Sequence, residues 1–190
     1  FTGTNSVAGL EYAEKKLSTL TASSSNSLDF TSNIDSTYNI YKFRFINIHP
    51  SNNATRLKYN VSVDGGSNYN VAKTTTSFQA YHNESDSATG LLYETGTDLA
   101  QGTGSQFLGG DISNANDGCM SGTMFLFDPS STTFVKHIIA TCYSMTNGDF
   151  ATFHNTGTGY ANTTSAVDAV QFTMSSGTID SGTIEMYGIN

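Results

Sequence analysis

The chain has 16 Asp and Glu residues among 190, and these acids are its most obvious catalytic candidates. Hydrolysis of a glycoside needs two carboxylates that converge on one bond. Two pairs are candidates for that role: Asp98 with Asp111, and Glu84 with Asp86. All of these acids fall in Ser-, Gly- and Asn-rich stretches, where carboxylates are normally solvated, and chance pairs are numerous among so many acids. We therefore predict no catalytic residues and no enzymatic activity.

Serine and glycine motifs give no stronger indication of catalysis. Ser121 and Ser176 have the residue type of a nucleophile, but neither lies in a G-x-S-x-G motif. The segment Gly102-Thr103-Gly104 lacks the third glycine and the following helix of a phosphate-binding loop. These motifs predict neither acyl transfer nor nucleotide binding.

Metal ligands are also scattered in the sequence. His49, His82, His137 and His154 fall on separate predicted strands or strand ends, and no pair has close metal-ligand spacing. The loop from 111 to 118 has the oxygen-rich composition of a calcium site, but Ala115 occupies the fifth position of an EF-hand loop. We predict no bound metal and no cofactor, and leave an irregular structural calcium site as an alternative.

Cys119 and Cys142 match neither a metal spacing nor a redox pair. The segment 128–133 is typical of a turn, and a symmetric hairpin centred between Ser130 and Ser131 would place the two cysteines opposite each other. A disulfide is therefore one interpretation. We favour the simpler one, two small buried residues with free thiols.

Tyrosines suggest a binding chemistry. Tyr and Asn on the loops of a sandwich can stack on sugars and hydrogen-bond to them, and Tyr143, Tyr160 and Tyr187 are available for this. The chain has no Trp, the best stacking surface for a pyranose ring. A more ordinary interpretation is that these tyrosines are strand or interface residues.

The composition is dominated by 27 Thr, 24 Ser, 17 Asn and 18 Gly, with only 13% charged residues. This bias disfavours a helical bundle, while 12 Phe and 10 Tyr can build a core. A net charge of −8 disfavours nucleic-acid binding. No apolar run approaches the roughly 18 residues that span a bilayer, so we expect no membrane insertion.

Residues 26–190 are predicted to form one antiparallel β-sandwich domain, similar to a jelly roll. The strongest strand signal is TYNIYKFRFINIH at 37–49, in which Tyr41, Phe43 and Phe45 should share one face. The runs 120–127 and 134–145 are apolar on both faces, which is typical of central strands. About ten strands with polar turns favour a sandwich over a ligand-enclosing barrel. The core is expected from 37–48, 120–127 and 134–141.

Residues 1–25 differ from the rest and are predicted to form an N-terminal arm. Within 10–17, Leu10, Ala13, Glu14 and Leu17 would share a face of a short helix. The low-complexity stretch 19–27 predicts a linker or an extended arm. Such an arm either anchors the chain on a neighbouring subunit or is a mobile end, and the sequence leaves both alternatives open.

Five blocks carry a resemblance to a known family: LDFTSNIDSTYNIYKFRFINIHPS, GSNYNVAKTTTSFQAYH, SGTMFLFDPSSTTFVKHIIAT, NTTSAV and FTMSSGTIDSGTIEMYGI. In these blocks the chain resembles a family of small uncharacterised or virion-associated proteins encoded by marine tailed phages. The resemblance implies a component of the phage particle, assembled in the host cytoplasm. It supplies no catalytic residues.

Together these observations predict a non-enzymatic structural protein of a phage virion, either a capsid decoration protein or a tail or fibre subunit. It would associate with itself as a homo-oligomer, of which a trimer is one form, and dock on other capsid or tail proteins. The alternative is a receptor-binding module of the virion that recognises a host-surface glycan.

Overall fold

The computed structural model describes residues 14–146 and 151–190, and this part of the chain contains twelve β-strands and no helix. The strands are β1 (Lys15–Thr21), β2 (Leu28–Phe30), β3 (Ile40–Pro50), β4 (Leu57–Ser62), β5 (Lys73–Asn83), β6 (Thr89–Tyr93), β7 (Gln106–Phe107), β8 (Met120–Phe127), β9 (Lys136–Met145), β10 (Ala151–Ala161), β11 (Ala169–Met174) and β12 (Ile179–Ile189).

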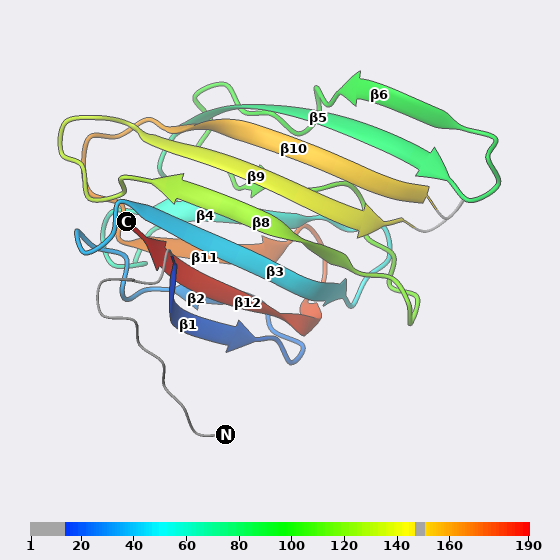
Figure 1. Ribbon diagram of the computed structural model, residues 1–190, viewed down its shortest axis with the longest axis horizontal. Coiled ribbons are helices and arrows are strands. Elements are labelled where there is room, and N and C mark those ends of the chain that lie inside the picture. Colours follow the sequence, from blue (N-terminus) through cyan, green and yellow to red (C-terminus); the bar gives the residue numbers. More distant parts are fainter. Residues whose placement is uncertain (1–13, 147–150) are drawn as a thin grey trace, which may run out of the picture.

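The strands form two antiparallel sheets that pack face to face (Figure 1). The eight-stranded sheet has the order β1-β12-β3-β8-β9-β10-β5-β6, and the four-stranded sheet has the order β2-β11-β4-β7. The predicted all-β antiparallel sandwich is confirmed. Between β1 and β12 the chain passes repeatedly from one sheet to the other, which is the feature that it shares with a jelly roll.

Alternation along β3 supplies the centre of the core, as predicted. Tyr41, Phe43 and Phe45 are at most 1% exposed, whereas Lys42 and Arg44 point to the other face of the sheet. From the four-stranded sheet, Phe172 packs edge-on against the rings of Phe30, Phe43 and Phe45, with centroid distances of 6.1, 5.4 and 5.3 Å. Each such ring pair adds about 0.5–1.5 kcal/mol beyond the area that it buries.

A tight turn follows β4. Gly65 and Gly66 have φ angles of +70° and +84°, which other residues rarely adopt. The carboxylate of Asp64 accepts hydrogen bonds from the Asn68 side chain and backbone and from the Ser62 hydroxyl, at 2.7–2.9 Å. These bonds, led by the one from the Asn68 side chain, lower the pKa of Asp64 to about 2.

Strands β8 and β9 are central in the larger sheet, as predicted, but only one face of each is covered. Ile139 and Tyr143 on β9 are 39% and 52% exposed, because they point away from the four-stranded sheet. Phe134, which was expected in the core, lies in the preceding loop and is 68% exposed. The apolar pattern on both faces of these strands therefore marks one buried face and one face in contact with solvent.

The β8–β9 hairpin has a different register from the symmetric one that the cysteines suggested. Cys142 lies opposite Gly122, whereas the amide of Met145 donates a hydrogen bond of 3.1 Å to the carbonyl of Cys119. The cysteines are therefore not opposite each other, and both are free. Burial raises the pKa of the Cys142 thiol to about 12.

The described part of the N-terminal region is a strand, so the predicted helix over 10–17 is wrong where it can be compared; residues 10–13 lie outside the described residues. Strand β1 pairs with β12 and has a bulge between Lys16 and Ser18. The bulge lets Leu17 and Leu20 both pack against the core, and their spacing of three imitates a helical period. Ser25 forms a further bridge with Ile179, so 15–25 is attached to the sandwich.

Candidate functional site

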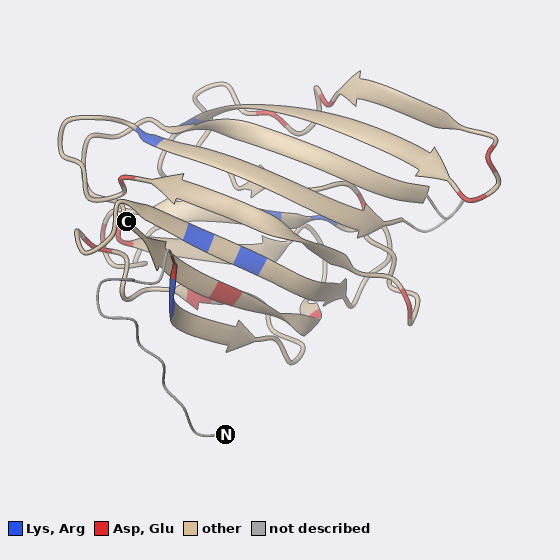
Figure 2. Cartoon of the chain, in the orientation of Figure 1, with Lys and Arg blue, Asp and Glu red and all other residues tan. Residues whose placement is uncertain are grey.

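We call the side of the eight-stranded sheet that faces away from the four-stranded sheet the outer face. Its charged side chains gather over β3 and β12, while the central strands are almost bare of charge (Figure 2). Strands β8 and β10 contain no Asp, Glu, Lys or Arg, and the single lysine of β9, Lys136, is fully buried. The middle of the outer face is therefore an uncharged surface of hydroxyl, aromatic and aliphatic groups.

The tyrosines proposed for sugar binding all lie on this outer face, but on strands and not on loops. Tyr143 is on β9, Tyr160 on β10 and Tyr187 on β12. They do not form one site, because Tyr160 lies opposite His137 and Tyr143 lies six positions further along β9. At the rise of a strand this is a separation of about 20 Å.

A hollow in the outer face lies between β3 and β9, beside Tyr143. It forms because β8, the strand between them, carries only small side chains at this level. Its lining residues are Arg44, Phe45, Ile46, Ser121, Gly122, Thr123, Thr141 and Tyr143. The hollow thus has a guanidinium at one side, a phenol ring at the other and hydroxyl groups along its floor.

Gly122 allows β8 and β9 to approach closely beneath this hollow. A Cβ at this position would lie 2.4 Å from the carbonyl oxygen of Thr141 and 2.7 Å from the Cα of Cys142. Both are backbone atoms, so any larger residue would force the two strands apart.

A bulge in β3 shapes the rim of the hollow. The pairing of β3 with β8 shifts between Phe45 and Ile48, and Asn47 there has a φ of +49°. The amide of Asn47 donates a 3.1 Å hydrogen bond to the hydroxyl of Ser121. Ser121, one of the serines considered as a nucleophile, therefore ties β8 to the bulge.

Arg44 is held at the edge of the hollow by Glu185. Its Nε and Nη2 atoms donate to one carboxylate oxygen of Glu185 at 2.9 and 2.5 Å, and Tyr187 donates to the same oxygen at 2.8 Å. The Tyr187 hydrogen bond is the largest cause of the lowered pKa of Glu185, and the bond to Glu185 raises the pKa of Arg44. The Arg44 side chain is 44% exposed, so it retains N–H donors for a ligand.

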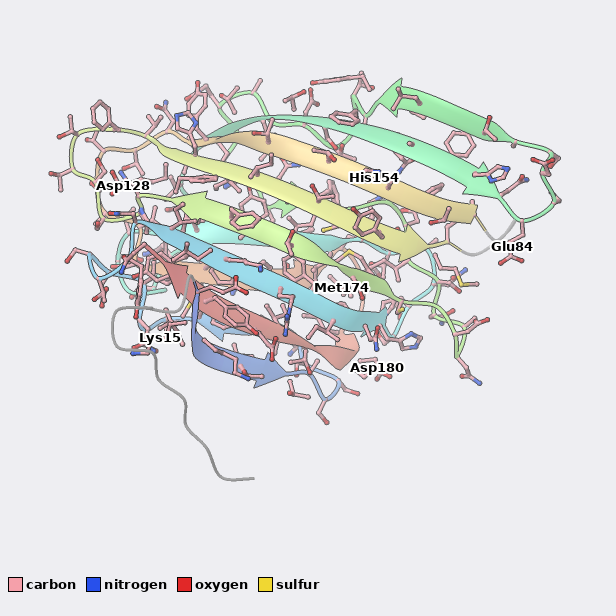
Figure 3. The ribbon with its side chains drawn as sticks, in the orientation of Figure 1. Lys15, Glu84, Asp128, His154, Met174 and Asp180 are labelled. Atoms are coloured by element: carbon pink, nitrogen blue, oxygen red, sulfur yellow. The ribbon has the colours of Figure 1, made fainter. Side chains whose placement is uncertain are left out.

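His154 of β10, labelled in Figure 3, is the neighbour of Tyr143 on the side away from β8. The two rings are 4.9 Å apart at the centroids with an interplanar angle of 35°, and the residues are direct cross-strand partners. The phenol ring is thereby steadied while 52% of the residue stays exposed. Hydroxyl groups, one guanidinium and an aromatic face are groups that bind ligands, by hydrogen bonds, charge and stacking.

The acids considered for glycoside hydrolysis are not brought together by any described contact. Asp98 accepts a 2.6 Å hydrogen bond from the hydroxyl of Tyr93, and Asp111 lies 2.6 Å from Nε of Arg56. Glu84 is exposed in the β5–β6 turn, where Asp86 lies 2.9 Å from His82. Each of these three contacts engages a different partner.

The histidines are equally separate. His49 contacts the carbonyl of Gly118 at 2.6 Å, His137 lies near Tyr160, and His154 lies against Tyr143. Within 14–146 and 151–190, no group of three or more His, Cys, Asp or Glu residues could hold a metal ion. In the loop considered for calcium, the carboxylate of Asp111 is already paired with Arg56.

Sequence reasoning missed two buried lysines. Lys73 on β5 and Lys136 on β9 are both 0% exposed, and both lie opposite Ala161 of the intervening strand β10. Lys136 donates to the carbonyl oxygens of Ser131, Phe134 and Thr163 at 2.6–3.2 Å. Their position in the strands was the available signal, because each lysine falls in register with the alternate residues of its strand that point inward.

Both buried ammonium groups are held by neutral oxygens. Nζ of Lys73 donates to Oδ1 of Asn60 at 2.5 Å and to the carbonyl of Val71 at 2.8 Å. Loss of hydration lowers the pKa of Lys73 to about 8 and also lowers the pKa of Lys136. We assign these lysines a structural role, because each fastens a loop to the sandwich.

Comparison with known proteins adds little to this geometry. No family model matches the chain, and no curated protein matches it. A crystal structure of a protein of unknown function from Bacteroides ovatus is similar, with a TM-score of 0.30 and 8% sequence identity. The match covers 56% of this chain and 45% of that one. In the described residues no helix is long and apolar enough to cross a membrane.

Proposed function

We propose that this protein is a non-enzymatic structural component of a phage virion, either a capsid decoration protein or a tail or fibre subunit. It acts through self-association and by docking on other capsid or tail proteins. The resemblance of its sequence blocks to virion-associated phage proteins supports this proposal at the level of sequence.

The observation that carries the proposal is the uncharged outer face. Ile139 and Tyr143 are exposed at its centre, and threonines such as Thr123 and Thr141 surround them. Apolar and hydroxyl groups lose little hydration energy when another protein covers them, whereas charged groups would lose much more. A face of this kind is suited to permanent contact with a neighbouring subunit.

The hollow beside Tyr143 favours a second candidate, a receptor-binding module that recognises a host-surface glycan. A sugar ring could stack on the exposed phenol while its hydroxyls contact Thr123, Thr141 and Arg44. The guanidinium of Arg44 would add selectivity for a sugar that carries a carboxylate or another anionic group. This candidate is compatible with a location on the virion.

Deletion of the gene from the phage distinguishes these functions. For a structural subunit we expect particles that fail to assemble or that lose infectivity faster on heating, with normal adsorption of the surviving particles. For a glycan-binding module we expect stable particles that adsorb poorly to the host. Particles with unchanged stability and unchanged adsorption would contradict both candidates.

A further inference from the structure

The two edges of the eight-stranded sheet are not alike. At one end, β1 carries Lys15 and Lys16 and is interrupted by a bulge, and both features discourage pairing with another strand. At the other end, β6 has the sequence TGLLY, with no charge, no proline and no bulge in its pairing with β5. Figure 1 shows β6 as the outermost strand of the sheet. Only β1 carries the features that protect an edge from pairing.

Strand β6 is also exposed on both of its faces. Leu91 and Tyr93 on the outer face are 74% and 50% exposed, and Leu92 on the opposite face is 41% exposed. A short strand with this much apolar exposure and an open edge is unusual in a monomer.

The hydrogen-bonding pattern shows which backbone groups of β6 are open. The amide of Glu94 donates to Ser77, and the amide of Asn83 donates to Ala88, so the alternate residues 90 and 92 also face β5. The N–H and C=O groups of Thr89, Leu91 and Tyr93 therefore point away from the sheet. A second strand could pair with these groups without disturbing β5.

We infer that β6 pairs antiparallel with β6 of a second copy of this chain, about a two-fold axis at Leu91. Leu91 then faces Leu91 of the other copy, and Thr89 faces Tyr93, so the open residues of one strand meet the open residues of the other. About six N–H···O bonds would form, and the two eight-stranded sheets would become continuous. This inference rests on the self-association in the proposed function and names the surface that performs it.

The charges near β6 are compatible with this pairing. No charged residue faces a like charge in the paired segment, and the next residue, Glu94, would lie opposite Ala88. Strand β1, by contrast, carries Lys15 and Lys16, whose charges disfavour burial against another strand. A two-fold contact uses the same patch on both copies and closes at a dimer.

The pairing is tested by sedimentation of the purified chain over a range of concentrations. We expect a monomer–dimer equilibrium, and we expect L91K to raise the dimer Kd about tenfold or more, equivalent to about 1.4 kcal/mol. F134K is the matched control, because it places the same charge on another exposed apolar residue, and it should leave the Kd unchanged. Circular dichroism and thermal melting confirm that both variants are folded.

Cysteine cross-linking in a C119S background tests the register. Residues at the two-fold in a hydrogen-bonded pair have Cα atoms about 5.5 Å apart, which permits a disulfide. L91C should therefore form a cross-linked dimer on mild oxidation, and T89C should not, because each Thr89 faces Tyr93. A chain that is monomeric at every concentration, or a dimer that L91K leaves intact, would overturn the inference.

These outcomes are separable from those of the proposed function. A monomeric chain that is nevertheless found in phage particles would refute the β6 pairing and leave the virion role standing. A chain that dimerises through β6 but is absent from particles would support the β6 pairing and refute the virion role.

Discussion

Nζ of Lys73 lies 2.5 Å from Oδ1 of Asn60, and this buried hydrogen bond joins the two sheets. Lys73 belongs to β5 of the eight-stranded sheet and Asn60 to β4 of the four-stranded sheet. Asn60 in turn donates to the carbonyls of Tyr69 and Thr103 at 2.6 and 3.1 Å. One lysine and one asparagine thus hold together the sheets and two of the connecting loops.

The burial of Lys73 predicts a specific pH dependence of stability. Its pKa falls from 10.5 to about 8 on folding, so between these values the unfolded chain binds more protons than the folded chain. Stability conferred by this residue therefore rises with pH in that window. We expect the wild type to gain about 1 kcal/mol of unfolding free energy from pH 8 to pH 9 relative to K73M.

Urea titrations at the two pH values measure this difference. Other groups whose pKa changes on folding, among them Cys142 with its raised pKa, act in both proteins and cancel in the comparison. K15M removes an exposed lysine and should keep the wild-type dependence. If the free energy of unfolding changes equally with pH in the wild type and in K73M, Lys73 is not the cause of the pH dependence.

Phe172 is predicted to be the most important single core residue. It is 0% exposed and contacts three aromatic rings from both sheets. We expect F172A to lower the free energy of unfolding by about 3–5 kcal/mol, because it leaves a cavity that the rigid sheets cannot fill. F134A removes an exposed ring and should change the same quantity by no more than about 0.5 kcal/mol. A small effect of F172A would contradict the described packing.

Glu185 is predicted to hold β1 on the sandwich. It accepts hydrogen bonds from Arg44 and Tyr187 and, at 3.4 Å, from Lys16 of β1. We expect E185Q to cost about 1 kcal/mol at neutral pH and to speed amide hydrogen exchange in β1. E84Q, in an exposed turn, is the control and should do neither.

The effect of E185Q on stability is predicted to depend on pH in the acid range. The pKa of Glu185 is below its ordinary value of 4.5 in the folded chain, mainly through the Tyr187 hydrogen bond. Its contribution is therefore present above pH 4.5 and is lost as the pH falls through the folded-state pKa. The difference in stability between the wild type and E185Q should shrink at low pH, and a constant difference would exclude this explanation.

The glycan-binding candidate predicts a selective effect of Tyr143. If a sugar stacks in the hollow, Y143A should weaken binding on a glycan array by at least about tenfold, because the stacking surface is removed. Y160A alters the same face about 20 Å away and should leave binding unchanged. Equal losses in both variants, or no binding by the wild type, would exclude this site.

Local pattern was sufficient to predict much of the fold. The alternation of Tyr41, Phe43 and Phe45 and the strand at 120–127 could both be predicted from the sequence, because each depends on neighbouring residues alone. Strand β10 has a weaker sequence signal, because its Thr-Gly-Thr-Gly segment has weak β propensity. Its full length is imposed by β9 and β5, which pair along both sides of it.

The remaining features of the fold and of the candidate site depend on contacts between residues that are far apart in the sequence. The hollow requires Arg44, Ser121 and Tyr143 to meet from three strands, and no spacing in the sequence encodes that neighbourhood. The β8–β9 register differs from that of a symmetric hairpin centred between Ser130 and Ser131, and the loop before Lys136 is held by the buried ammonium group, a contact that the local pattern does not reveal. The partition into eight and four strands also depends on pairings between distant segments, such as β12 with β3.

Quantitative mass spectrometry of purified phage particles tests the virion role most directly. We predict that the chain remains in a fixed ratio to the major capsid protein or to a tail protein through successive density gradients. Labelled antibody would then distinguish the head from the tail by electron microscopy. Recovery of the chain only from the lysate of infected cells, with none in the particles, would contradict the proposed function.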